Sequence, residues 1–442
     1  MSTLKTAGNW TRVAVPITNH RYIVPFVLIT SLFFLWAFGV NLNDILIPHL
    51  KKAFGLSDFR SSFIQVAFFG GYFVAAFPAG KLMERIGYKK GILAGLAICA
   101  TGALLFIPAS SLRIYEVFLF ALFILACGQS FLEVAANPYA TILGPAESSE
   151  RRLNFVQSFN ATGAVVATLL GRSLILTGVD YTPSQLASMS TAQMQTYQSA
   201  EASTVKLPYM LIAGVFLVVA GLIFFTHMPE VVETSSEDEA VHHPELRSVF
   251  SHGHLVRGVI AQFVYVGAQV GVASFVIRFV QYSARGTNEK AAATFLFYHL
   301  VGFMLGRFAG SAIMKLVPAS RLLAIFAAAC LLCAGVALSG TGLVPIWAIV
   351  LIGFFHSIMF PTIFALSIKS LGPLTKRGSS LLVMAILGGA ALPAIMGRIS
   401  DASNIQRAFI VPLISYVYIL YFALSGYKPA AGVAPISAME DR

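Results

Sequence analysis

Residues 80–90 of the sequence read GKLMERIGYKK, a short charged segment between two apolar runs at about 61–82 and 91–109. Each run is long enough to cross the hydrocarbon core of a bilayer as a helix, which takes about 20 residues. The pattern continues along the 442 residues, because 57% of them are apolar and 11% are charged, against roughly 25% charged residues in soluble domains. This composition excludes a soluble globular protein.

Apolar runs of spanning length recur along the whole chain, separated by short polar segments. They lie at about 23–48, 61–82, 91–109, 115–143, 153–177, 208–227, 256–284, 291–314, 321–340, 345–370, 379–399 and 408–427. The first run is too long for the apolar part of a secretory signal, and no small-residue cleavage point follows it, so we interpret it as a retained helix. The sequence therefore predicts an all-α polytopic membrane protein with twelve transmembrane helices.

A longer polar segment separates the first six runs from the last six. Residues 229–254 carry six acidic residues among serine and histidine, a composition that cannot form a core. We therefore predict an N-terminal six-helix bundle over 1–228, a cytoplasmic linker over 229–254 and a C-terminal six-helix bundle over 255–442. A faint internal repeat supports this division, since Asn137-Pro138 and Phe360-Pro361 occupy similar positions in the two halves.

The net charge of +11 follows from basic residues in the polar segments between the runs. With the N-terminus inside, the cytoplasmic segments hold 18 Lys and Arg and the outer segments hold nine. Cytoplasmic loops of membrane proteins carry such an excess. We therefore expect both termini in the cytoplasm. We expect the protein to lie in a lipid bilayer and to bind no nucleic acid.

Few acidic side chains lie inside the apolar runs, among them Asp44 toward the outer end of the first and Glu133 well inside the fourth. An ionisable residue there costs about 2.5 to 3.5 kcal/mol on insertion scales and usually serves function. Burial without a nearby cation favours the protonated form of a carboxyl, so we expect Glu133 to carry a proton and Asp44 to relay protons from outside. The alternatives are a water-exposed helix end for Asp44 and, for Glu133, an internal pair with Arg172 or Arg278.

Neutral polar residues form stripes at helical spacing on otherwise apolar runs. They are Asn41 beside Asp44; Gln129 and Asn137 around Glu133; Asn154, Gln157 and Asn160; and Gln262, Tyr265 and Gln269. Four stripes facing one axis would line a wet cavity of amide donors and acceptors, which suits a neutral polyhydroxylated ligand. The stripes of the first half contain no Lys or Arg, which disfavours an anionic substrate. The alternative is that the amides only join helices, at about 0.6 kcal/mol for each hydrogen bond.

Trp36 could present its ring to a sugar or pack against neighbouring helices. His299 and His356, in the eighth and tenth runs, are interpreted as core histidines, with a second titrating site as the alternative. The four cysteines lie in apolar runs without a histidine or an acid at ligand spacing, which indicates packing. We therefore expect that the protein is not an enzyme and binds no metal or cofactor, and that protons are the coupling ion.

The segment GKLMERIGYKK resembles the signature loop between the second and third helices of the major facilitator superfamily. Gly80, Glu84, Arg85, Gly87 and Lys89 stand at the signature positions. The resemblance implies the fold of that superfamily, with Gly80 permitting close helix contact and the charged residues latching the cytoplasmic ends in one state. Glu84 stands where the superfamily more often has aspartate, which leaves the charge intact.

Five longer strings look like the L-fucose:proton symporter family, which also contains glucose/galactose and N-acetylglucosamine transporters. They are NLNDILIPHL, FLEVAANPYATILGP, RLNFVQSFNATGA, AQFVYVGAQ and SIMFPTIFALSIKSLG. The likeness implies two six-helix bundles around a central cavity. It further implies Asp44 and Glu133 as coupling carboxylates, and Asn41, Gln157 and Asn160 as contacts for sugar hydroxyls.

The residues and the resemblance together predict a proton-coupled monosaccharide importer of a bacterial inner membrane, working by alternating access as a monomer. L-Fucose is the first candidate substrate. The alternatives among transporters are a glucose/galactose or N-acetylglucosamine symporter, an uncoupled facilitator and a drug exporter. The rivals from another class are a membrane enzyme and a sugar sensor. We expect Trp36, Gln129, Asn137 and Gln269 to add substrate contacts. Phe360 stands where fucose transporters tend to carry tyrosine, so it bears on which sugar is bound.

Overall fold

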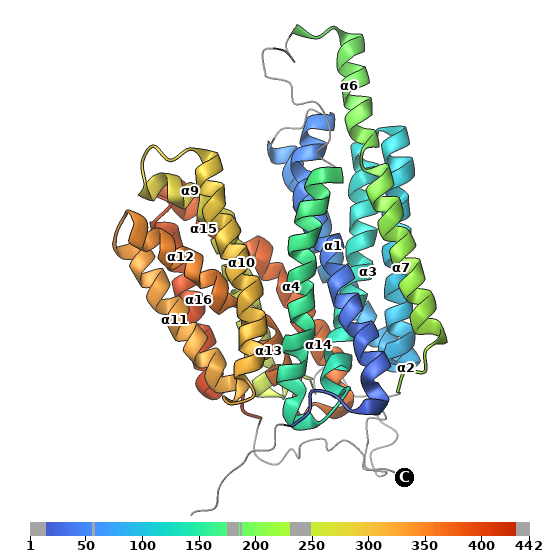
Figure 1. Ribbon diagram of the computed structural model, residues 1–442, viewed down its shortest axis with the longest axis vertical. Helices are drawn as coiled ribbons and strands as arrows, with labels where there is room; N and C mark the ends of the chain where they lie inside the picture. The colour runs from blue at the N-terminus through green and yellow to red at the C-terminus, as the bar shows by residue number, and fades with distance from the viewer. Residues whose placement is uncertain (1–14, 55–57, 175–184, 186–187, 230–248, 430–442) are drawn as a thin grey trace, which may run out of the picture.

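The computed structural model describes residues 15–54, 58–174, 185, 188–229 and 249–429 (Figure 1). Within these ranges, the side chains at 38–49, 51–53, 58–59, 61–62, 168–169, 171–174 and 289 are outside the description. The described residues form helices joined by short connections, which confirms the predicted all-α class.

The described residues of the N-terminal half form five long helices and one shorter helix. They are α1 Ile23–Phe54, α2 Asp58–Leu112, α3 Tyr115–Ile142, α4 Ser149–Leu174, α6 Thr191–Ser203 and α7 Lys206–Phe225, with the 3-10 turns η1 His20–Tyr22 and η2 Ala146–Ser148. Helix α2 packs along α3 and α7, and α1 packs along α4. The apolar faces of these helices form one core.

The C-terminal half contains more helix breaks than the N-terminal half. Its α-helices are α9 Gly253–Ser283, α10 Glu289–Ile313, α11 Ala319–Ser339, α12 Leu343–His356, α13 Met359–Ile368, α14 Thr375–Met384, α15 Gly388–Ala402 and α16 Ile410–Tyr421. The shorter elements are the 3-10 turns η4 Gly372–Leu374, η5 Ala385–Leu387 and η6 Arg407–Phe409, and the π-helical η7 Phe422–Gly426. Helix α9 packs on α15, α16 and α13, while α12 packs between α10 and α11.

The predicted apolar runs correspond to helices of the structure. Ten segments of the described chain are long and apolar enough to cross a membrane. One of them, Phe63–Leu112, contains two predicted runs, and α4 contains a further run that is not among the ten. The structure thus agrees with twelve crossings. Most of the predicted linker, residues 230–248, lies outside the described residues, so the domain boundaries stay predictions.

The charged segment 80–90 turns the chain inside α2. Gly87 has φ 77° and ψ 172°, a conformation that an L side chain rarely adopts. The α2 label therefore spans two successive helices with a turn at Gly87. The loop predicted between the second and third runs lies at this turn.

Helix α6 extends the N-terminal half beyond the other helices, and no apolar run predicts it (Figure 1). It begins with a capping box, in which the Ser190 hydroxyl accepts from the Gln193 amide N–H and the Gln193 side chain accepts from the Ser190 N–H. Polar capping and polar exposed residues, rather than an apolar face, account for this helix.

The tenth run is broken in the middle rather than continuous. Helix α12 ends at His356, and α13 begins at Met359. Pro361 has no N–H, and the ring of a proline opposes the carbonyl four residues earlier, here that of Ser357. The Ser357 carbonyl is therefore available to another donor.

The two halves come together at one end of the molecule and lie farther apart at the other (Figure 1). Helix α2 packs on α14, and α4 packs on α10 and α13, at the end that also carries the beginning of the described chain. We call this the closed end. It positions polar residues of both halves against one another.

Candidate functional site

A chain of hydrogen bonds joins three helices of the N-terminal half. The indole N–H of Trp36 donates to the Tyr72 hydroxyl over 3.0 Å, and that hydroxyl donates to Gln129 Oε1 over 3.3 Å. Gln129 Nε2 is buried without a hydrogen-bond partner among the described residues. Trp36 is only 4% exposed, and its ring lies 5.4 Å from that of Phe33, so in this conformation it packs inside the protein.

Glu133 is buried in the same region of α3, with 4% of its surface exposed. One helical turn further on, Asn137 Nδ2 donates to the Glu133 backbone carbonyl over 3.0 Å. The ion pairs of the described side chains do not include one to Glu133. Of the two arginines considered as its partner, Arg278 lies over the Phe275 ring at 4.2 Å, and the Arg172 side chain is outside the description.

Asn137 and Gln157 connect α3 to α4. Gln157 Nε2 donates to Asn137 Oδ1 over 2.9 Å, and both residues are buried. This bond fixes the orientation of the Gln157 amide, so that its oxygen points away from Asn137 and is free to accept from elsewhere. Asn160, one turn further along α4, is half-buried and donates to the Phe33 carbonyl over 3.1 Å.

Arg307 of α10 brings a positive charge from the C-terminal half to this cluster. It is 4% exposed, and its Nη1 donates to the Gln157 backbone carbonyl over 2.5 Å and to Gln157 Oε1 over 2.8 Å. Its Nε donates to the Ser357 carbonyl over 3.0 Å, the carbonyl that Pro361 leaves without its helical donor. Arg307 is not among the residues predicted for the site, although it is the one Lys, Arg, Asp or Glu in the run 291–314 and such residues usually serve function.

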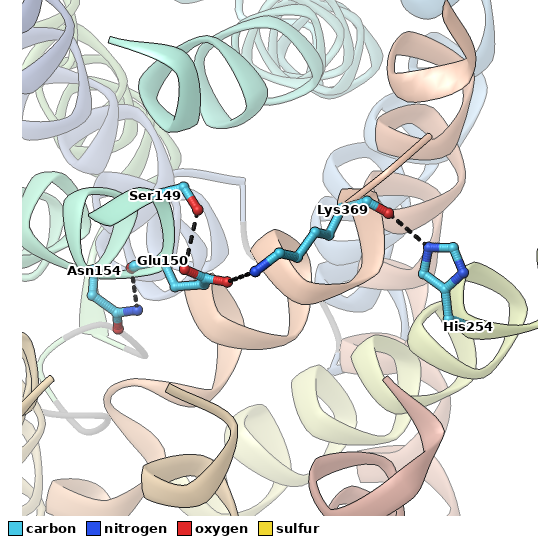
Figure 2. A network of polar contacts seen from close by, with 5 residues as sticks. All are labelled: Ser149, Glu150, Asn154, His254 and Lys369. Carbon is cyan, nitrogen blue, oxygen red and sulfur yellow. Dashed lines mark hydrogen bonds and ion pairs between the residues drawn. The ribbon is translucent and has the colours of Figure 1, made fainter. Parts of the chain in front are cut away.

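One face of α4 contacts the C-terminal half at successive turns. Glu150, Asn154 and Gln157 lie at i, i+4 and i+7. Glu150 Oε1 pairs with Lys369 Nζ at 2.9 Å, Asn154 Nδ2 donates to Thr362 Oγ1 over 3.1 Å, and Gln157 binds Arg307. Figure 2 shows the first of these contacts, with Lys369 between Glu150 and His254. The ring of His254 binds the Lys369 carbonyl over 2.9 Å. We call these three α4 residues the seal stripe.

The seal stripe changes the interpretation of one predicted amide. Asn154 belongs to the stripe that sequence analysis assigned to a ligand, yet here it joins two helices. The alternative that amides connect helices thus describes Asn154, whereas Gln157 has both an interface contact with Arg307 and a bond to Asn137.

The predicted latch residues lie at the closed end. Both carboxylate oxygens of Glu84 bind Arg377 of α14, at 2.5 Å from Nε and 3.0 Å from Nη2. A Cβ at Gly80 would collide with Ser380 of the same helix, so glycine is required for this approach. Lys89 instead donates to the carbonyls of Phe224 and Thr226 at the end of α7, within its own half. Arg85 is exposed.

The C-terminal half contributes a buried aromatic and histidine cluster. The Tyr265 hydroxyl donates to the His356 carbonyl over 3.1 Å, and His356 Nε2 lies 2.7 Å from the Tyr416 hydroxyl. His299 Nδ1 binds the Ile349 carbonyl over 3.0 Å. Both histidines therefore have partners in the core, as their primary interpretation predicts.

The remaining predicted site residues have fewer contacts in the described part of the structure. Phe360 is 8% exposed, with its ring centre 6.4 Å from that of Tyr265. Gln269 is half-buried on α9. Asn41 and Asp44 lie within α1, but their side chains are outside the described part of the structure, so their roles stay predictions.

Comparison with known proteins gives consistent matches over almost the whole chain. A model of the Major Facilitator Superfamily matches residues 29–392. A glucose/galactose transporter of Brucella abortus biovar 1 (strain 9-941) is 43% identical over 412 residues, which cover 93% of this chain and 96% of that protein. The L-fucose-proton symporter of Escherichia coli (strain K12) is 42% identical over 410 residues, which cover 92% of this chain and 93% of that protein.

Solved structures support the same placement. A crystal structure of FucP, described as a Major Facilitator Superfamily transporter in the outward conformation, superposes with a TM-score of 0.84. It is 40% identical in sequence, and the match covers 91% of this chain and 98% of that one.

Proposed function

Since the chain belongs to the Major Facilitator Superfamily, we propose that it imports a neutral monosaccharide together with protons by alternating access. The observation that carries the proposal is Glu133, a carboxyl buried beside amide side chains and without an ion pair to a described side chain. Such a group is most stable in its protonated form and can exchange a proton as its surroundings change. The coupling ion is the proton, and no other cofactor takes part.

Relatives named as transporters and symporters support this function over an enzymatic one. They also support a multi-pass protein of a bacterial inner membrane. The excess of Lys and Arg supports a cytoplasmic position for the closed end and for both termini. With that orientation, the structure has the arrangement of an outward-facing state, and one chain supplies both bundles, so we propose a monomer.

In the proposed site, Glu133 binds the transported proton and Asp44 controls its entry from outside. Gln157 and Asn137 bind sugar hydroxyls, aided by Asn41, Asn160 and others. Amide groups suit this task because each offers both donors and acceptors. The remaining contacts come from Gln129, Trp36, Gln269 and Phe360.

L-Fucose remains the first candidate sugar, and D-galactose and D-glucose follow closely. Two relatives with these different names have nearly the same identity to the chain, 42% and 43%. Phe360 stands where fucose transporters tend to carry tyrosine, and this one position favours D-glucose and D-galactose over L-fucose. N-Acetylglucosamine is the third choice.

The proposal is tested by adding each of the four sugars to de-energised cells that express the protein. Coupled uptake alkalinises the medium in proportion to the sugar taken up, and cells without the protein serve as the control. We expect alkalinisation with at least one sugar. Uptake of a sugar without alkalinisation would show a facilitator, and no uptake of any of the four would overturn the proposed substrate class.

A further inference from the structure

Arg307 occupies a position that no part of the proposed transport scheme yet uses. It belongs to the C-terminal half, but two of its three hydrogen bonds end on Gln157 of the N-terminal half. Since alternating access requires the halves to separate at the closed end, these two bonds must break in every transport cycle. Arg307 is therefore part of the mechanical connection that keeps the closed end shut.

The position of Arg307 near Glu133 makes its electrostatic energy depend on whether that carboxyl is ionised. A series of hydrogen bonds connects Arg307 to the Glu133 region across the interface of the halves: Arg307 donates to Gln157 Oε1, Gln157 to Asn137 Oδ1, and Asn137 to the Glu133 carbonyl. Opposite charges on Arg307 and Glu133 attract one another over this short path. Tyr72 of α2 donates to Gln129, which lies one helical turn before Glu133. Tyr265 of α9 donates to the His356 carbonyl, next to the Ser357 carbonyl that accepts from Arg307. In a site of low dielectric constant such an attraction is much stronger than in water. An ionised Glu133 thus holds Arg307, and with it the C-terminal half, against α3.

The second restraint on Arg307 is the Gln157 side chain. Asn137 holds the nitrogen of that amide, so its oxygen is the only atom left to accept from Arg307 or from a ligand. A sugar hydroxyl that donates to Gln157 Oε1 shares this oxygen with the guanidinium and weakens the bond between them. The bound sugar and the closed interface therefore compete for one oxygen atom.

We propose that Arg307 keeps the closed end shut until two conditions hold together: Glu133 is protonated and a sugar hydroxyl occupies Gln157 Oε1. This inference rests on the proposed function. A proton alone leaves the bond to Gln157, and a sugar alone leaves the attraction to Glu133. Only the loaded and protonated carrier opens inward, so Arg307 prevents leakage of either species alone.

The proposal can be tested by measuring the width of the closed end directly. Spin labels are attached to Lys90→Cys in the N-terminal half and Lys315→Cys in the C-terminal half, both exposed at the closed end, in a background without the four native cysteines. Distances between the labels are measured at acidic and at alkaline pH, with no sugar, with L-fucose and with D-galactose. The wild-type sequence should show a long distance only at acidic pH with a sugar.

Three substitutions separate the two conditions. Glu133→Gln should let a sugar open the closed end at both pH values, because the charge is gone. Gln157→Ala should let acidic pH open it without any sugar. Arg307→Gln should abolish both dependences and raise the long-distance population about tenfold or more, since a charge-assisted hydrogen bond is lost. Arg307→Lys keeps the charge and should retain the pH dependence.

A matched control removes a different contact of the seal stripe. Lys369→Gln breaks the pair with Glu150 and should widen the closed end similarly under all conditions. The proposal is overturned if Arg307→Gln, folded and monodisperse, keeps the pH and sugar dependence of the wild type. The response of Gln157→Ala to pH needs no sugar, so it tests Arg307 even if none of the sugars binds. Failure of the sugar-driven response alone would instead count against the proposed function.

Discussion

The guanidinium of Arg152 shows how this protein stabilises a buried charge without an ion pair. It is fully buried at the closed end and donates to the Ser148 hydroxyl and to five backbone carbonyls. These belong to Ile17, Ala140, Thr141, Gly144 and Pro145. Burial lowers the pKa of Arg152 to about 10, which still leaves it charged at neutral pH. The side chain ties α4 to the turn after α3 and to the chain before α1.

Arg152→Lys should therefore destabilise the protein, although it keeps the charge. A lysine has three donors on one nitrogen and leaves several of these carbonyls unsatisfied, at about 1 to 3 kcal/mol each. We expect a clear fall in the unfolding temperature in detergent, together with lower yield. Arg85→Lys is the matched control, because Arg85 is exposed. Equal unfolding temperatures for the two variants would show that the carbonyls do not need this guanidinium.

At the level of elements, the break between α12 and α13 determines where Arg307 is anchored. Pro361 removes a helical hydrogen bond, and Arg307 replaces it at the Ser357 carbonyl. Broken helices near the middle of the membrane recur in transporters at their binding sites. The break thus links the helix geometry of the C-terminal half to the seal stripe of the N-terminal half.

Pro361→Ala supplies the missing N–H and should let α12 and α13 join. The Ser357 carbonyl then has its own helical donor, and Arg307 loses one of its three bonds. We expect transport to slow by about tenfold, since a change of roughly 1.4 kcal/mol in one state has this effect, while sugar binding persists. The control is Pro108→Ala, at an exposed proline within α2. An unchanged transport rate for Pro361→Ala would show that transport does not depend on the break between α12 and α13.

The helices themselves could be predicted from the sequence because a bilayer demands apolar runs of fixed length. Glu133 and Asn137 were also predictable as neighbours, since helical spacing places them on one face of the same helix. The partner of Gln157 could not be predicted in the same way, because Arg307 lies 150 residues away and spacing within a helix does not show which helices meet. The α6 helix was missed because it has no apolar run, and Asn154 was assigned to a ligand because a stripe does not reveal what faces it.

For the whole molecule, the closed end is maintained by contacts at several depths. Glu84 pairs with Arg377 near the surface, Glu150 pairs with Lys369 beside it, and Gln157 binds Arg307 deeper inside. The two ion pairs are partly exposed, with side-chain exposures of 16% and 22% in the first and 48% and 11% in the second. Water screens such pairs, so each contributes modestly. Together they bias the molecule toward one state.

A double-mutant cycle at Glu84 and Arg377 should measure one of these contributions. The spin-label measurement at the closed end gives the population with a long distance. Glu84→Gln and Arg377→Gln should each raise this population about fivefold, which corresponds to about 1 kcal/mol. The double variant should shift little more than either single variant. Additive shifts would mean that the pair does not couple the halves.

The central claim is that Glu133 carries the transported proton, and Glu133→Gln tests it most directly in vesicles that contain the purified protein. Exchange of labelled for unlabelled sugar needs no net proton movement, so the variant should retain it, whereas accumulation driven by a proton gradient should be lost. Glu116→Gln, at an exposed residue paired with Arg60, should retain both. Gradient-driven accumulation by Glu133→Gln at the level of the wild type would contradict the claim.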